Sequence, residues 1–208
     1  KETMRQQDVQ EFCRVLMQNL EDKLKNTDLA STINDLFRGH SRTYIRCKNV
    51  PYNKEIPEDF KDLSLVVKNC KNLEESLKRE LEPQVLDGDD MYETDEYGKQ
   101  EAIMGVEFTE FPSVLHIHLR RFDRDFERNT CVKINDRFEF PAEIDLSEFL
   151  AADADKTKSQ VYDLYGVLIH SGGSMCGHYY AYLRISQDPQ WYRFDDQNSL
   201  AGHISIGV

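Results

Sequence analysis

Two residues near the C-terminal end of the chain have types and spacing that suit proton-transfer chemistry. His178 stands at the start of an aromatic segment, Gly177 to Leu183, and Asp195 directly follows a second one, Trp191 to Phe194. A turn signal, Ser-Gln-Asp-Pro, separates the two segments, so they are predicted to pair as a hairpin. A histidine base and a carboxylate that orients it are two of the three parts of a cysteine-protease type of active site. The third part, a nucleophile, is not evident among the five cysteines.

The roles follow from the chemistry of the two side chains. His178 would take a proton from a nucleophile and later return one to a leaving amine. Asp195 would accept a hydrogen bond from the other ring nitrogen and so hold the ring and its tautomer. Asp196 is the alternative, because strand alternation lets only one of two neighbours face the histidine. Considered alone, His178 is better interpreted as a histidine whose hydrogen bonds are satisfied within a sheet.

Composition limits the kind of protein. The chain has 208 residues, of which 39% are apolar and 11% aromatic, enough to build one large core or two small ones. No apolar run approaches the roughly 20 residues that span a membrane, and the charged N-terminal end does not resemble a signal peptide. The five scattered cysteines suit reduced thiols, so we expect an intracellular protein. The net charge of −12 argues against a nucleic-acid surface. It favours a basic partner, but most of it is expected to be solvated surface that keeps the protein soluble.

Hydrophobic periodicity predicts an α+β fold with a helical opening and a strand-rich body. Apolar residues at helical spacing predict helices over Gln6–Lys25, Leu29–Phe37 and Leu73–Leu81. The acidic segment from Leu86 to Gly98 has no apolar period and predicts a turn-rich connection. Alternating or continuous apolar runs predict strands, the last five as an antiparallel set, at His40–Cys47, Phe60–Val67, Val114–Arg120, Arg137–Phe140, Tyr165–His170, Tyr179–Arg184 and Trp191–Phe194.

Four segments, taken together in this order, resemble the ubiquitin-specific proteases. They cover nearly the whole chain, and their order and spacing make a chance match improbable. The segments are Gln6-Gln7-Asp8-Val9-Gln10-Glu11-Phe12, Phe111-Pro112-Ser113-Val114-Leu115-His116-Ile117-His118-Leu119-Arg120-Arg121-Phe122, Gly177-His178-Tyr179-Tyr180-Ala181-Tyr182 and Phe194-Asp195-Asp196.

The resemblance implies a papain-like cysteine protease fold, a right hand of thumb, palm and fingers. Residues 1–38 would then belong to the thumb, 39–110 to the fingers and 111–208 to the palm, all within one catalytic domain. The family's nucleophile lies in an Asn-x-Gly-x-x-Cys-Tyr box before the Gln-Gln-Asp motif, and its domain ends on a further apolar strand. Neither occurs in this sequence, so we expect a partial catalytic domain dominated by antiparallel strands.

The resemblance also implies an activity and a set of site residues. The expected function is a deubiquitinating cysteine protease of the nucleus or cytoplasm that hydrolyses the bond at the C-terminus of ubiquitin. His178 would be the base, and Asp195 is preferred to Asp196 because it directly follows the phenylalanine of the family motif. Asp8, Phe122 and Tyr179 would contact the ubiquitin tail, which is basic and would suit an acidic protein. Without the resemblance, Asp8 would be interpreted as a partner of the helix dipole, and Phe122 and Tyr179 as aromatic core residues.

No cofactor or metal is expected. Many relatives carry two Cys-x-x-Cys zinc-binding pairs in the fingers, but here only Cys47 of the first pair remains, and a tetrahedral thiolate site needs four ligands. Cys13 lies on the apolar helix face, as a core residue would. Two other functions stay open: a ubiquitin-binding module that never cleaves, and an unrelated hydrolase using Cys176 with His178. The last is disfavoured because a sequence neighbour of the base is rarely placed for attack.

Overall fold

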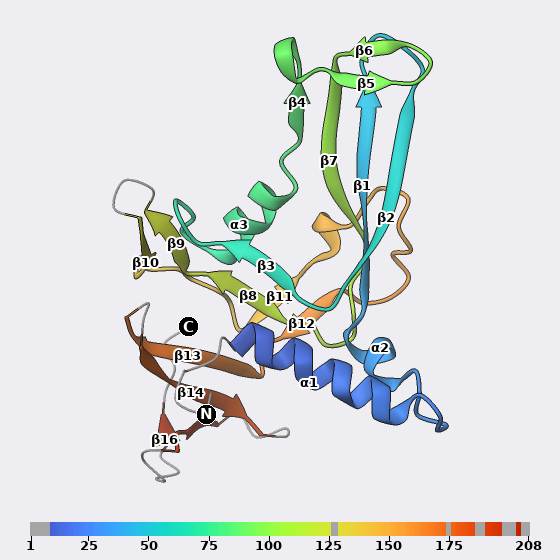
Figure 1. Cartoon of the computed structure of the whole chain (residues 1–208). Coiled ribbons are helices and arrows are strands. Elements are labelled where there is room, and N and C mark those ends of the chain that lie inside the picture. Colours follow the sequence, from blue (N-terminus) through green and yellow to red (C-terminus); the bar gives the residue numbers. More distant parts are fainter. Residues whose placement is uncertain (1–8, 126–128, 174–175, 186–189, 197–202, 205–208) are drawn as a thin grey trace.

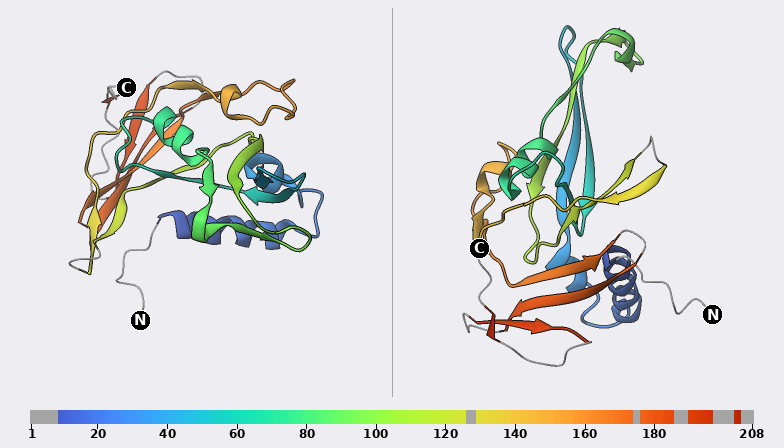
Figure 2. Two further views of the ribbon diagram at one scale, coloured as in Figure 1. Left: turned by 90° about the horizontal axis from the view of Figure 1, so that it is seen from above. Right: turned by 90° about the vertical axis from the view of Figure 1, so that its left-hand side faces the viewer.

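A long sheet rises from a more compact body (Figure 1). The structure, a computed structural model, describes residues 9–125, 129–173, 176–185, 190–196 and 203–204. The helix α1 lies at the base of the molecule, at the end opposite the β5–β6 tip, in two views (Figures 1 and 2). Within the described residues, none of the helices is long and apolar enough to cross a bilayer.

The long sheet has the strand order β2-β1-β7-β4, and all its pairs are antiparallel. The acidic segment that we expected to be a turn-rich connection also contains a short hairpin, β5 paired with β6. The buried Thr94 closes this hairpin: its hydroxyl donates to Gly98 O and accepts from Tyr97 N. The bounds are β1 Gly39–Cys47, β2 Asn53–Phe60, β4 Gln84–Leu86, β5 Tyr92–Thr94, β6 Gly98–Gln100 and β7 Ala102–Glu110, with a 3-10 turn at Gly88–Asp90.

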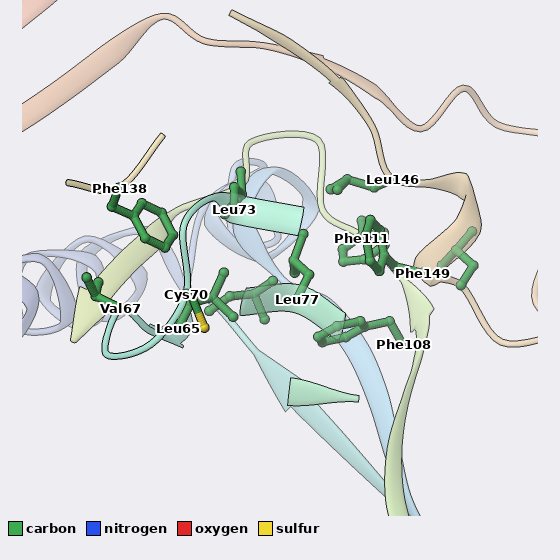
Figure 3. Packing of buried hydrophobic residues seen from close by; sticks show 12 residues of the cluster. Leu65, Val67, Cys70, Leu73, Leu77, Phe108, Phe111, Phe138, Leu146 and Phe149 are labelled. Atoms are coloured by element: carbon green, nitrogen blue, oxygen red, sulfur yellow. The ribbon is translucent and has the colours of Figure 1, made fainter. Parts of the chain in front are cut away.

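The main core lies where the long sheet meets the body. Here β3 (Leu63–Val66) pairs in parallel with β8 (Ile117–Arg120), and α3 (Leu73–Glu80) packs beside them. Asn72 caps α3 by accepting a hydrogen bond from Glu75 N at 2.9 Å. Figure 3 shows the apolar side chains converging from segments far apart in sequence; the buried members are Leu63, Leu65, Val67, Cys70, Leu73, Leu77, Phe108, Phe111, Phe138, Leu146, Phe149 and Leu150.

Two of the predicted strands are corrected here. The strand predicted from Val114 begins only at Ile117, because Val114 N donates to Leu36 O instead, and its partner β3 is parallel rather than antiparallel. No strand forms over Arg137–Phe140: Glu139 makes an isolated bridge with Asn72. Phe138 is buried in the core, so its apolar character serves packing rather than a strand pattern. In the segment predicted as a strand over Val114–Arg120, the alternating Leu115, Ile117 and Leu119 pack on the core.

The sheet that carries the catalytic candidates, called the site sheet below, has the antiparallel order β13-β14-β15-β16. This confirms the antiparallel pairing predicted for the last three segments. Its bounds are β13 Gly166–Gly172, β14 Gly177–Arg184, β15 Trp191–Phe194 and β16 His203–Ile204. Two short pairs flank it along the chain, β9 (Phe122–Asp125) with β10 (Thr130–Lys133) and β11 (Glu143–Asp145) with β12 (Val161–Asp163), and a 3-10 turn covers Ser147–Phe149.

The two opening helices are α1 (Val9–Leu24) and α2 (Thr32–Phe37). Although the apolar face of α1 predicts packing, only Met17 on it is buried, and Phe12 is 58% exposed. The helix is fixed instead through Asp62, which accepts hydrogen bonds from Gln10 at 2.7 Å and from Arg14 at 2.9 and 3.0 Å. Burial alone would raise the pKa of Asp62, but these hydrogen bonds hold it below its ordinary value.

Candidate active site

Strand register brings His178 and Asp195 together. Tyr182 lies opposite Arg193 and Ala181 opposite Phe194, so Asp195, the next residue beyond β15, comes level with Tyr180. His178 is two residues from Tyr180 on β14 and therefore shares its face. The two candidates are thus diagonal neighbours across a strand pair, a separation that side chains of their size can bridge.

The side chains make one short hydrogen bond. His178 Nε2 lies 2.7 Å from Asp195 Oδ1, and the Asp195 side chain is only 1% exposed. Asp196 Oδ1 lies 3.5 Å from the same nitrogen, but its side chain is 86% exposed. Because a buried carboxylate is held by its surroundings while an exposed one is mobile and hydrated, Asp195 is the residue able to orient the ring.

This arrangement leaves one ring nitrogen for chemistry. With Asp195 accepting from Nε2–H, the neutral ring carries its lone pair on Nδ1, where it can receive a proton from a nucleophile. His178 and Asp195 line an open depression together with Tyr179, Phe194 and Asp196. The site therefore pairs a partly exposed histidine with a buried carboxylate, an arrangement that can serve general base catalysis.

Arg193 is a residue of the site that the sequence analysis did not single out. Its Nη2 donates to Asp195 Oδ2 at 2.5 Å, on the carboxylate oxygen that His178 does not use. Its guanidinium carbon lies 4.4 Å from the centre of the Tyr180 ring. The available signal was alternation: Arg193 stands two residues before Asp195, so extending the strand period by one residue places both on one face.

Glycines shape the loop that leads into His178. A Cβ on Gly177 would lie 2.2 Å from His170 Nε2 and 2.4 Å from Ser171 O, closer than packing allows. Gly172 has φ +114°, a conformation open to glycine but not to other residues. By contrast, a Cβ on Gly173 would meet nothing within 4 Å. Lys133 of β10 holds the base of this loop, donating to the carbonyls of His170 at 2.7 Å and Gly172 at 3.1 Å.

The three predicted ubiquitin contacts are placed as follows. Phe122 and Tyr179 both pack on His170, with ring centres 5.6 and 4.8 Å from its own. Tyr179 neighbours His178 in the strand and so points to the other face of β14, although it also borders the depression. Asp8 lies outside the described residues.

Three of the cysteines discussed above differ in exposure and in their place in the fold. Cys176 is exposed at the end of the loop before His178, Cys13 is half-buried on α1, and Cys47 is half-buried at the end of β1. Within the part of the chain that the structure describes, one group of three His, Cys, Asp or Glu side chains has its ligand atoms within 4.8 Å of one another. That group is His178, Asp195 and Asp196, the candidate active site itself.

Comparison with known proteins assigns the chain to a family. Residues 1–201 match the family described as Ubiquitin carboxyl-terminal hydrolase. The chain is 47% identical over 191 residues to Ubiquitin carboxyl-terminal hydrolase 5 of Schizosaccharomyces pombe, covering 92% of this chain and 17% of that protein. It is 46% identical over 191 residues to Ubiquitin carboxyl-terminal hydrolase 7 of Drosophila melanogaster, again covering 92% of this chain and 17% of that protein. The chain therefore spans about a sixth of the length of these relatives.

The fold has solved counterparts. One is the structure of the SAGA Ubp8/Sgf11/Sus1/Sgf73 DUB module bound to ubiquitin aldehyde. This chain matches it with a TM-score of 0.82 and 28% sequence identity, covering 97% of this chain and 46% of that one. The strand-dominated α+β architecture is thus a partial catalytic domain of the expected type. From its family match, its relatives and its fold, the chain belongs to the ubiquitin carboxyl-terminal hydrolase family, as one of the ubiquitin-specific proteases.

Proposed function

We propose that this chain is part of a deubiquitinating cysteine protease that hydrolyses the peptide or isopeptide bond at the C-terminus of ubiquitin. The observation that carries the proposal is the 2.7 Å contact between His178 and the buried Asp195, in a chain of this family. Relatives over this region are named ubiquitin carboxyl-terminal hydrolases, and a structural counterpart binds ubiquitin aldehyde.

In the proposed mechanism, His178 accepts the proton of a cysteine thiol at Nδ1. The thiolate attacks the carbonyl carbon of the ubiquitin C-terminal residue, and the imidazolium then protonates the leaving amine. Asp195 keeps the ring in the required tautomer and stabilises the imidazolium. The thiol would come from a segment outside these 208 residues, because the chain holds no Asn-x-Gly-x-x-Cys box. His178 would later activate the water that releases ubiquitin.

Three finer assignments belong to the same proposal. Asp8, Phe122 and Tyr179 contact the basic ubiquitin tail, a role supported by the position of Tyr179 at the edge of the depression. The chain is similar to the herpesvirus-associated ubiquitin-specific protease, a likeness supported by Ile134 to Pro141 and Val85 to Asp89. The whole protein acts in the nucleus or cytoplasm, without nucleic-acid or membrane partners, as its charge and cysteines favour.

The test compares hydrolysis of a ubiquitin-tail fluorophore by this chain and by the natural protein extended upstream through its next cysteine-containing segment. We expect turnover only by the longer protein, abolished by His178→Ala. His40→Ala is the matched control, since His40 Nδ1 lies 2.7 Å from Asp59 Oδ1 far from the site, on β1. A longer protein that binds ubiquitin without cleaving it would replace the proposal with the binding module. Cleavage by the short chain would point to Cys176.

A further inference from the structure

The Asp195 carboxylate is buried and ion-paired, and this makes its partners decisive. With 1% exposure, its side chain has almost no contact with water. A buried carboxylate is costly unless charge and hydrogen bonds compensate it. A neutral His178 supplies a hydrogen bond at Oδ1 but no charge. Arg193, at 2.5 Å from Oδ2, is the cation that compensates it.

The two contacts hold the carboxylate from opposite sides. His178 occupies Oδ1 and Arg193 occupies Oδ2, so rotation of the carboxylate about its own axis would break both bonds. Removing Arg193 would take away its charge and its hydrogen bond at Oδ2, and so weaken the hold on the carboxylate that faces the histidine. The tautomer of a histidine ring is set by the hydrogen bond that its N–H makes, so that weakening would change the tautomer ratio of His178.

Arg193 is itself held in place. Its direct partner across the strands is Tyr182, yet its guanidinium lies over Tyr180, two residues closer to His178 along β14. The Tyr180 ring contacts Tyr182 edge-on, with ring centres 5.7 Å apart, and lies 6.5 Å from His178 in a stacked orientation. An arginine over an aromatic face is favoured electrostatically and loses little further freedom when it binds a carboxylate.

We infer that Arg193 is a positioning residue: lying on Tyr180, it fixes Asp195 so that His178 keeps the proton on Nε2 and presents Nδ1 to the nucleophile. The inference rests on the proposed function, because it assumes that His178 acts as the base. Its test does not require cleavage, so the two can fail separately.

The experiment records the ¹⁵N resonances of His178 in this 208-residue chain across a pH titration, which report the ring tautomer directly. The charged groups described around His178 are Asp195, Asp196 and Arg193. In Arg193→Met, which keeps the aliphatic stem on Tyr180 but loses the charge, we expect the ratio of Nε2–H to Nδ1–H tautomer to fall about tenfold. Arg193→Lys keeps a charge and a donor and should restore most of the ratio.

Arg184→Met is the matched control. Arg184 lies on the same face of β14 as Tyr180 and Tyr182, and its Nη2 is 3.9 Å from Asp163 Oδ1. Removing its charge should leave the tautomer ratio unchanged. If Arg193→Met does not fold, Arg193→Gln takes its place with the same expected fall. An unchanged ratio in a folded neutral variant, an equal fall in Arg184→Met, or unfolding of both neutral variants beside a folded Arg193→Lys would each overturn the inference.

Discussion

In the long sheet one arginine is shared by several carboxylates, whereas at the end of the site sheet one carboxylate is shared by two basic side chains. Arg42 of β1 binds Glu107 of β7 at 2.7 and 2.9 Å and Asp153 at 2.6 and 2.9 Å, with Glu55 of β2 at 3.5 Å. Hydrogen bonds to Asp153 and Glu107 raise the pKa of Arg42 above its ordinary value.

The two clusters differ in how exposed their carboxylates are to solvent and in how readily water can replace the charged partner. Asp153 is 65% exposed, so water and salt can replace much of what Arg42 provides. Asp195 is 1% exposed, and His178 and Arg193 bind its two separate oxygens. The Arg42 cluster joins β1, β2, β7 and the segment at Asp153, and should contribute to stability alone. The Asp195 cluster should control chemistry, and single substitutions there should have much larger effects.

The largest expected effect tests which carboxylate matters. Asp195→Asn in the upstream-extended protein should lower kcat/KM for the ubiquitin-tail fluorophore by about 10²- to 10⁴-fold, because the ring loses its anionic partner. Asp196→Asn, one residue away and 86% exposed, should stay within a few-fold of wild type. Equal losses in the two variants would contradict the assignment of Asp195.

The next effect concerns the backbone that delivers His178. Gly177→Ala should destabilise the chain by about 1–3 kcal/mol, because the new methyl group would overlap His170 and Ser171 O. Urea unfolding followed by circular dichroism measures the change. Gly173→Ala, in the same loop with open space around it, should shift the free energy of unfolding by less than about 0.5 kcal/mol. A Gly177→Ala protein as stable as Gly173→Ala would show that the loop adapts freely.

A smaller effect is expected in the long sheet. Arg42→Met should lower the free energy of unfolding by about 1–2 kcal/mol at low salt, since it leaves three carboxylates close together. The loss should shrink in 1 M NaCl, where the remaining repulsion is screened. Arg137→Met is the control, because its pair with Glu139 is formed by an 87% exposed side chain and should contribute little. A salt-independent loss would mean that Arg42 acts through packing.

The smallest effect concerns His116, a half-buried histidine of the body. Burial lowers the pKa of His116, while Asp62 raises it by less, and its ring packs on Phe37 at 5.0 Å. The unfolded chain therefore binds a proton at a higher pH than the folded one, so stability falls as the pH drops below about 6.5. His116→Gln should remove up to about 1 kcal/mol of the loss between pH 7.5 and 5.5. Urea unfolding at both pH values measures it.

A high salt concentration distinguishes the effect expected at Arg42 from the one expected at His116. Because the lowered pKa of His116 arises chiefly from desolvation, its share of the pH dependence should persist in 1 M NaCl. If the free energy of unfolding changes with pH equally in wild type and His116→Gln, His116 does not contribute to the acid sensitivity of the fold.

Local pattern predicted much of the site sheet. The periodicity of residues 165–170, 179–184 and 191–194 matched β13, β14 and β15 to within two residues at each end. With two antiparallel strands and a four-residue turn signal, alternation alone restricts which side chains share a face with His178. It could not distinguish Asp195 from Asp196, because both lie beyond the end of β15, where the strand pattern stops.

Longer-range features did not follow from pattern. The apolar residues around Phe138 predicted a strand, yet Phe138 fills a core whose other buried members come from residues 63–77, 108–111 and 146–150, with one bridge at Glu139. Residues 53–60, which carry a proline and mostly exposed side chains, form β2 because β1 supplies the hydrogen bonds. Such pairing depends on a partner distant in sequence rather than on the segment's own propensity.

By itself the sequence determined the α+β class, the antiparallel hairpins near the C-terminal end and the presence of a histidine and a carboxylate there, since these depend on periods of 2 and 3.6 residues and on side-chain type. The tertiary structure alone decided that Asp195 is buried while Asp196 faces water, that Arg193 leans over Tyr180 toward it, and that Phe122 meets Tyr179 through His170. Burial and side-chain direction at the end of a strand are set by every element packed around it, and no local period encodes them.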